Sequence, residues 1–157
     1  MTRITTLTIA VLLLPLCALA QTSPPTAAPG FARAGTAADP LPPAGLTLDD
    51  FLWTARPLIV FADSPNDPGF QRQMQLLAAD PAPLLDRQVV IIADADAGTP
   101  SDLRRRFRPN GFAILLVDTN GRVLLTRPTP RSVREISAAV DKSPQRRQEL
   151  QDRQSGG

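Results

Sequence analysis

Three runs of apolar residues mark the predicted core strands of this chain. The first, Leu58–Ala62, stands between Pro57 and Asp63. It is rich in Ile, Val and Phe and too short for a core helix, so it predicts a strand buried on both faces. Val89–Ala93 and Phe112–Val117 repeat the pattern. The sequence therefore predicts one α/β domain organised around a central strand.

Helical patterns separate these runs. Asp67 can cap a helix that has Pro68 at its first position, and apolar residues then recur at helical spacing at Phe70, Met74 and Leu77. The Asp80–Pro83 segment should end this helix, and Leu84–Arg87 should lead into the second strand. Thr99–Asp102 repeats the start signal. The last domain helix is expected to open at Thr129-Pro130 and to end before Pro144.

Turn residues predict a hairpin after the third strand. Asp118–Gly121 places a glycine where a turn needs a left-handed backbone, and Val123–Thr126 should return antiparallel. A short helix should open the domain at Thr47–Asp50, and Trp53 should close its apolar face as a core plug at the rim. A ligand platform is the alternative role of Trp53. The predicted order is β-α-β-α-β-β-α after this opening helix.

The remaining segments differ in composition from the domain, which we place at residues 46–143. Residues 21–45 hold six of the 17 prolines and only two large apolar residues, Phe31 and Leu41, so they predict a disordered linker. Residues 144–157 form a polar tail with Leu150 as its only large apolar residue. A frayed helix or disorder is expected there.

The first 20 residues have the pattern of a secretory signal peptide. Arg3 precedes the apolar run Leu7–Leu16, and Ala18-Leu19-Ala20 is a small-x-small cleavage site. Lipidation at Cys17 and an uncleaved anchor are the alternatives, although Leu16 is larger than the residue that usually precedes a lipidated cysteine. The apolar run is shorter than the roughly 20 residues of a membrane-spanning helix. We therefore expect a secreted or periplasmic protein with no stable membrane insertion after cleavage.

The missing residue types exclude several kinds of chemistry. The chain has no histidine, so it can form no Ser-His-Asp triad, no Cys-His pair and no histidine metal site. Its single cysteine, Cys17, lies within the signal peptide. A net charge of +2 gives no overall field for nucleic acid. Acid–base chemistry would depend on carboxylates alone.

The order of elements resembles the thioredoxin fold, a three-layer α/β/α domain with a mixed four-stranded sheet. More narrowly, the chain resembles the DUF4174 family, a thioredoxin-like domain of bacterial secreted proteins and animal extracellular matrix proteins. The resemblance rests on the order and spacing of short motifs over roughly Leu46 to Leu150: Trp53 with Arg56–Ala62, Asp86-Arg87, Leu103-Arg104 with Phe107, Gly111-Phe112, Asp118 with Gly121, and Pro144 with Arg146–Glu149. It implies the fold and no established activity.

The chain departs from working thioredoxins at the reactive loop. Their chemistry needs a low-pKa thiolate at the start of the first crossover helix, where this chain has Asp63–Pro68 and no cysteine. They also place a cis-proline just before the third strand, where this chain has Asn110-Gly111, with Pro109 slightly too early. Thiol–disulfide exchange and thiol peroxidase activity are therefore excluded for the cleaved chain.

The predicted topology gathers polar residues at one edge of the sheet. The ends of strands one and two and the start of strand three meet there, so we expect a protein or ligand site formed by Asp63, Asp67, Asp94, Asp96, Arg108 and Asn110. Asp94 and Arg108 would be its polar anchors, with Trp53 nearby. Oxygen ligands at this edge could instead hold Ca²⁺ or Mg²⁺. Helix-cap, turn and solvated-loop roles would also explain the aspartates.

Arg104–Arg106 and Arg108 form the densest positive run of the chain. On a helix they could bind an anion or an acidic partner, because guanidinium groups suit carboxylate and phosphate. Pairing with nearby aspartates is the alternative use. Nucleic-acid binding would also need interleaved aromatic residues.

These observations predict a non-catalytic thioredoxin-like domain that binds an unknown protein or ligand outside the cytoplasm. No cofactor and no nucleic acid are expected. The alternatives are a metal-dependent hydrolase that uses carboxylates at the sheet edge, and a structural or matrix-associating protein.

Signal cleavage after Ala20 gives a direct prediction. Mass spectrometry of the secreted protein should find a chain that begins at Gln21, either free or cyclised to pyroglutamate. Recovery of a chain that begins with diacylated Cys17 would contradict this and would make the protein membrane-anchored.

Overall fold

The computed structural model describes residues 36 and 39–156. The predicted signal peptide, Cys17 and most of the predicted linker lie outside the described residues. The described elements, in chain order, are η2 (Asp49–Phe51), β1 (Arg56–Phe61), α1 (Pro68–Ala79), α2 (Ala82–Asp86), β2 (Val89–Asp94), α3 (Asp102–Phe107), β3 (Ala113–Val117), β4 (Val123–Arg127), α4 (Val133–Asp141) and α5 (Pro144–Ser155).

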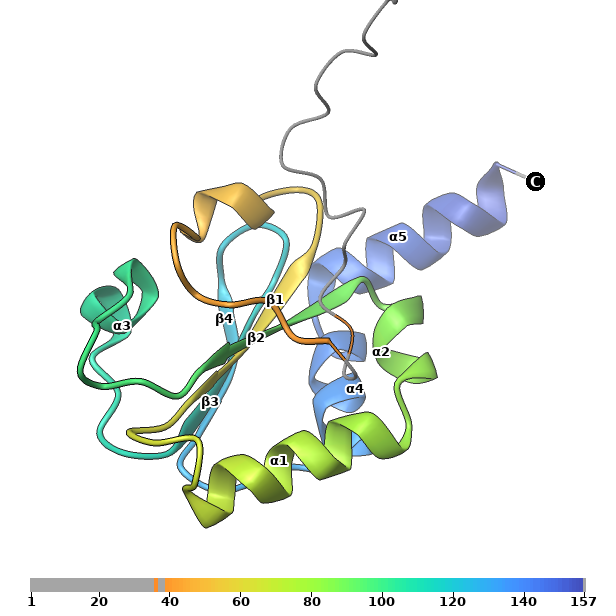
Figure 1. Cartoon of the computed structure of the whole chain (residues 1–157). Helices are drawn as coiled ribbons and strands as arrows, with labels where there is room; N and C mark the ends of the chain where they lie inside the picture. Colours follow the sequence, from red (N-terminus) through yellow and green to blue (C-terminus); the bar gives the residue numbers. More distant parts are fainter. Residues whose placement is uncertain (1–35, 37–38, 157) are drawn as a thin grey trace, which may run out of the picture.

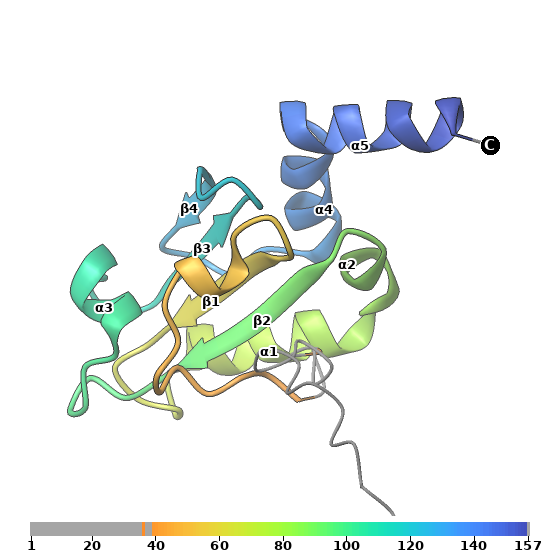
Figure 2. The same cartoon turned by 90° about the horizontal axis from the view of Figure 1, so that it is seen from above.

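The four strands form one mixed sheet in the order β2-β1-β3-β4, which Figure 2 shows from above. Strand β1 pairs parallel with β2 and antiparallel with β3, and β4 pairs antiparallel with β3. Every residue of β1 is buried. The predicted central strand is confirmed, and so is the thioredoxin-like fold.

Helices cover both faces of the sheet, which Figure 1 shows nearly edge-on. On one face, Leu58 and Val60 of β1 share a core cluster with Leu77 of α1 and Ile136 of α4. On the other face, Ile59 and Phe61 pack with residues of η2 and α3, among them Phe51 and Leu103. Successive side chains of β1 thus enter opposite cores, as a strand buried on both faces requires.

Local capping explains where the crossover helices begin. The Asp67 side chain accepts a hydrogen bond from the Phe70 amide at 2.9 Å, and Ser101 does the same for Arg104 at 2.9 Å. The cap at Asp67 is the predicted one, and Ser101 lies within the predicted start segment Thr99–Asp102. Each cap satisfies an amide that the first turn of a helix leaves unpaired.

Two helix boundaries differ from those expected. The predicted lead-in to β2 contains a short helix, α2, which a proline in its first turn permits. The last domain helix begins at Val133 and not at Thr129-Pro130. Ser132 and Glu135 form a capping box there, and Gln73 of α1 hydrogen-bonds both the amide and the carbonyl of Arg131, so the backbone before Ser132 is held outside the helix.

Ordered structure extends beyond the predicted domain at both ends. Leu41, expected in the linker, donates its amide to the Ile91 carbonyl at 2.9 Å and accepts from the Ala93 amide at 3.0 Å, so it covers the outer edge of β2. The predicted tail forms α5, whose Arg146 is buried, and whose later turns extend away from the sheet (Figures 1 and 2). No helix in the described part of the chain is long and apolar enough to cross a membrane.

The prediction that Trp53 is a core plug is wrong. Its side chain is 70% exposed, and its backbone has φ +62°. The Trp53 amide donates to the Thr119 carbonyl at 2.7 Å, which fixes this left-handed turn just before β1. The neighbouring Phe51 takes the buried place instead.

The buried strands give a stability prediction. Val60→Asp and Ile91→Asp should each prevent folding, because an unpaired buried charge costs several kcal/mol and a small domain has only about 5–15 kcal/mol of stability. Val123→Asp is the matched control, since Val123 lies in edge strand β4 and is 43% exposed. Circular dichroism and thermal melting should show a folded, cooperative Val123→Asp variant only. Cooperative unfolding of the Val60→Asp variant would contradict the sheet assignment.

Candidate functional site

The fold brings the predicted loops together at one end of the sheet. Phe61, the last residue of β1, lies opposite Asp94 of β2 and Ala113 of β3. We call this end the loop edge and define it by residues 63–67, 94–98 and 108–112. Because β1 and β2 run parallel and β3 antiparallel, the ends of two strands and the start of a third meet here.

One buried guanidinium organises the loop edge. Arg104 of α3 donates from Nε to Asp94 Oδ1 at 3.0 Å and from Nη2 to the carbonyls of Ala62 and Asp94 at 2.6 and 2.8 Å. Its guanidinium lies 5.6 Å from the centre of the Phe61 ring. Ala62, which follows β1, and Asp94, which ends β2, are therefore joined through α3. Among the arginines of the positive run, Arg104 serves a structural ion pair.

Asp94 is a support of the site and not an exposed anchor. Its side chain is 1% exposed, and its second oxygen accepts from the Ser101 hydroxyl at 2.5 Å. This burial does not favour direct contact with a partner, and the anchor role of Asp94 stays a prediction. Sequence alone could not separate Asp94 from Asp96, because both follow an apolar strand at a loop.

The other predicted residues divide into a helix cap and exposed groups. Asp67 caps α1. Asp63 is mostly exposed and lies 3.4 Å from Arg104 Nη1. Arg108 ends α3 in the left-handed conformation, with φ +48° and an exposed side chain, and Asn110 is exposed as well. No peptide bond in the described residues is cis, so Pro109 does not reproduce the thioredoxin cis-proline.

Asp96 is fully exposed, and its carboxylate caps its own turn. The Gly98 amide donates to it at 2.8 Å, and this bond, with a further one from the Thr99 side chain, lowers the pKa of Asp96 from its ordinary value. The group is therefore ionised at neutral pH and available to solvent.

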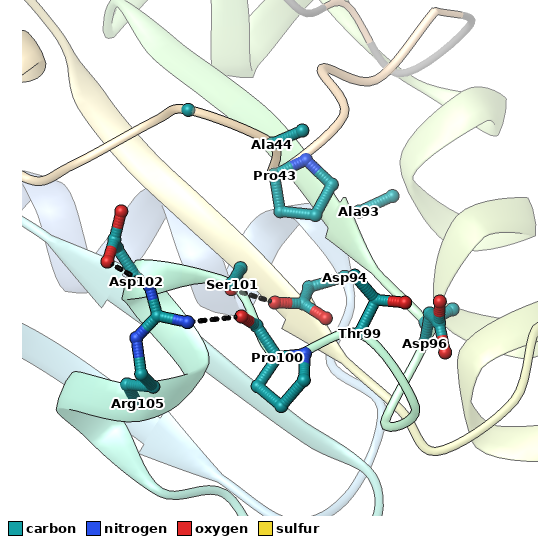
Figure 3. Close-up of a pocket in the computed structure, with 12 residues that line it drawn as sticks. Pro43, Ala44, Ala93, Asp94, Asp96, Thr99, Pro100, Ser101, Asp102 and Arg105 are labelled. Carbon is teal, nitrogen blue, oxygen red and sulfur yellow. Dashed lines mark hydrogen bonds and ion pairs between the residues drawn. The ribbon is translucent and has the colours of Figure 1, made fainter.

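A pocket of about 370 Å³ opens beside this turn. Figure 3 shows it between Pro43 and Ala44 on one side and the Thr99–Ser101 loop on the other. Its mouth carries the exposed ion pair of Asp102 with Arg105. The Pro43–Gly45 wall comes from the segment that the sequence predicted as linker, so composition concealed this part of the site.

The described residues contain no group of three His, Cys, Asp or Glu side chains that could hold a metal ion. The aspartates at the loop edge have separate partners. Asp63 faces solvent and Arg104, and Asp67 accepts from the Phe70 amide of α1. Asp94 binds Arg104 and Ser101. The arrangement supplies polar loop groups over a rigid base and no converging carboxylate set.

A second buried charge network closes the opposite end of β1. Arg56 is fully buried and donates to Asp118 at 2.8 Å, to the Arg87 carbonyl at 3.0 Å and to Glu149 at 2.5 Å. Arg146 of α5 joins it by pairing with Glu149 and with Asp86. We call Arg56, Asp86, Asp118, Arg146 and Glu149 the Arg56 network. Arg87 also donates to the Pro83 carbonyl, so its side chain holds the segment that precedes β2.

Trp53 lies at this second end and not near the loop edge. It lines a hollow with Thr119, Gln145 and Glu149. The expectation that Trp53 stands near the candidate site is therefore wrong.

The motifs that the sequence shares with DUF4174 are now placed in the structure. Asp86, Arg146 and Glu149 belong to the Arg56 network, and Arg104 holds the loop edge. The family model described as "Domain of unknown function (DUF4174)" matches residues 47–149. The chain belongs to the DUF4174 family. The match ends within α5, at Glu149, whose carboxylate contacts both Arg56 and Arg146.

Among solved structures, the reduced 2-Cys peroxiredoxin of Plasmodium vivax is similar, with 18% sequence identity and a TM-score of 0.49. The match covers 61% of this chain and 81% of the peroxiredoxin chain. No curated protein matches significantly. For this DUF4174 domain, the thioredoxin-like description therefore rests on the strand order and pairing given above.

The buried pair at the loop edge gives a prediction. Asp94→Asn removes the buried counter-charge of the Arg104 guanidinium and leaves only the exposed Asp63 carboxylate near it, which should cost about 3 kcal/mol. Asp96→Asn, the same substitution two residues later at a fully exposed side chain, is the control and should leave the melting temperature unchanged. Chemical denaturation of both variants measures the difference. Equal stability of the two variants would show that the Arg104–Asp94 pair does not hold the loop edge.

Proposed function

We propose that this DUF4174 domain is a non-catalytic binding module that acts outside the cytoplasm, in the secreted or periplasmic space. Its partner is a protein or an extracytoplasmic ligand, and contact is made at the loop edge. The observation that carries the proposal is the loop edge itself: where a redox protein of this fold would hold a reactive thiol, this chain has a helix cap.

The cap leaves no nucleophile for thiol chemistry. Asp67 stands at the start of α1, and its carboxylate accepts a hydrogen bond from the Phe70 amide. From Gln21 to Gly157 the sequence contains neither cysteine nor histidine. Disulfide exchange requires a thiolate, so the cleaved chain has no group that could perform it.

The rest of the loop edge supports binding. Its base is rigid, because Arg104 joins the residue that follows β1 to the residue that ends β2. Over this base, Asp63, Asp96, Arg108 and Asn110 present exposed polar groups on loops. Loops positioned by a rigid scaffold are the usual place for recognition residues. Since Asp94 is buried, Asp96 takes its place with Arg108 as the proposed pair of anchors.

A carboxylate-based hydrolase is less well supported. It would need Asp94 free to bind metal or substrate, and both Asp94 oxygens already have partners in Arg104 and Ser101. A general acid or base must reach the proton it transfers. No observation at the loop edge favours this chemistry over binding.

The proposal predicts the outcome of two measurements. The chain from Gln21 onward should reduce no insulin disulfide and consume no peroxide under any thiol condition. A partner that co-purifies with this chain from its native extracytoplasmic fraction should bind Arg108→Glu and Asp96→Arg variants about tenfold more weakly, since each reverses an anchor charge.

Arg134→Glu on the exposed face of α4 is the matched control and should bind normally. Arg108→Glu and Arg134→Glu should keep the parental melting temperature, because each replaces an exposed side chain. Asp96→Arg should lower it slightly, because the Gly98 amide loses its acceptor, and should still unfold cooperatively. Thiol-dependent turnover would overturn the non-catalytic assignment. Undiminished partner binding by both loop variants would place the site elsewhere on the domain.

A further inference from the structure

A second surface of the domain is a continuous groove between β4 and α4. Two adjoining hollows of about 400 and 350 Å³ form it, and both are lined by Leu124, Ala139 and Lys142. We call it the β4–α4 groove. Strand β4 is at the opposite edge of the sheet from β2, and the loop that follows β2 forms the pocket described above.

The floor of the groove is apolar because of an irregularity in β4. Leu116 lies opposite Leu125 while Val117 lies opposite Val123, so Leu124 is an extra residue in the ladder. Side chains of a regular strand alternate between faces, and a bulge interrupts this alternation. Leu124 and Leu125 accordingly both pack against the core cluster that includes α4.

The walls of the groove are basic. Arg122, Arg127, Lys142 and Arg147 line it, and none of them forms an ion pair with another described residue. Buried cations elsewhere, such as Arg56 and Arg104, are paired within the fold. The groove therefore carries positive charge that the described part of the chain does not neutralise.

Its one acidic lining residue does not compensate this charge. Glu135 accepts bonds from the Ser132 amide, the Ser132 hydroxyl and Arg131, and these lower its pKa to about 2. Its carboxylate is thus already used in the α4 capping box and in pairing Arg131.

The backbone of β4 is open along the same groove. β4 is an edge strand, hydrogen-bonded to β3 on one side, and no other described strand adjoins it. The opposite edge, at β2, is covered by Leu41. An unpaired strand edge offers amides and carbonyls to an added strand. Outside the β3–β4 ladder, the Thr126 carbonyl of β4 accepts one described hydrogen bond, at 3.0 Å from the flexible side chain of Arg127.

We propose that the β4–α4 groove binds an acidic extended peptide, which adds to the free edge of β4 and places its carboxylates against Arg122, Arg127, Lys142 and Arg147. Apolar side chains of the peptide pack on Leu124 and Leu125. This goes beyond the loop-edge proposal, because it uses a different surface and a partner of defined chemistry. Single-stranded nucleic acid fits less well, since no aromatic residue lines either hollow for base stacking.

The probe is a fluorescent peptide of about eight residues in which pairs of glutamates alternate with pairs of valines, so that both residue types face the groove when the peptide is extended. This length covers the roughly 17 Å that a five-residue strand spans. Fluorescence anisotropy should show saturable binding that weakens with added salt. A peptide of the same charge with prolines in place of the valines should bind at least about tenfold more weakly, because proline cannot donate to the ladder. Equal binding of the proline peptide would overturn strand addition.

Protein variants test the charge contribution. The double variant Arg127→Glu/Lys142→Glu should weaken the glutamate peptide by about a hundredfold and bind a lysine-valine peptide in its place. Arg72→Glu/Arg134→Glu makes the same charge change at exposed positions outside the groove and should bind the glutamate peptide within about twofold of the parent. Melting curves should show that both double variants are folded. A switch of the groove variant from the glutamate peptide to the lysine peptide cannot result from lost stability, because an unfolded variant would bind neither peptide.

Two outcomes would assign the groove to another partner and overturn the proposal. One is tighter binding of anionic lipid vesicles or of a sulfated polysaccharide than of the peptide, lost in the groove variant alone. The other is equal loss of peptide binding in the groove and control variants, which would show attraction to net charge without a defined site.

Discussion

The fully buried guanidinium of Arg56 joins three parts of the chain that lie far apart in the sequence. It stands at the first residue of the central strand and donates to Asp118 after β3, to the Arg87 carbonyl before β2 and to Glu149 of α5. A charge in this position is stable only while all of its partners remain, because a buried unpaired ion is costly. The attachment of α5 and the closed end of the sheet therefore both depend on it.

Arg104 has the corresponding role at the other end of β1. It links Ala62, which follows β1, to Asp94, which ends the parallel neighbour β2. Between these two arginines every residue of β1 is buried, so the strand has apolar layers on both faces and a guanidinium at each end. Five donors in a planar fork allow arginine to bind carbonyl and carboxylate groups on several sides at once, whereas the lysine ammonium has three donors on a single nitrogen.

The two candidate surfaces differ in how their charges are used. At the loop edge, Asp94 and Arg104 neutralise each other and support exposed loops of mixed charge. In the β4–α4 groove, basic residues line an open strand edge without described counter-ions. Natural proteins often protect such edges with charge, and the same residues can select an acidic strand. Stability and recognition are thus assigned to different arginines of one small domain.

Local sequence determined the strands and the helix starts near Asp67 and Ser101, because apolar runs and helix-start residues act over a few positions. Tertiary structure alone decided which polar residues are buried. Arg146 lies in a polar segment, yet pairs with Asp86, 60 residues away. Asp94 and Asp96 have similar neighbours, but only Asp94 meets Arg104. Trp53 has an apolar local pattern, yet the bond to Thr119 turns it outward, and Leu41 is ordered because β2 offers an edge. Such contacts join distant residues and leave no local periodicity, so the sequence could not reveal them.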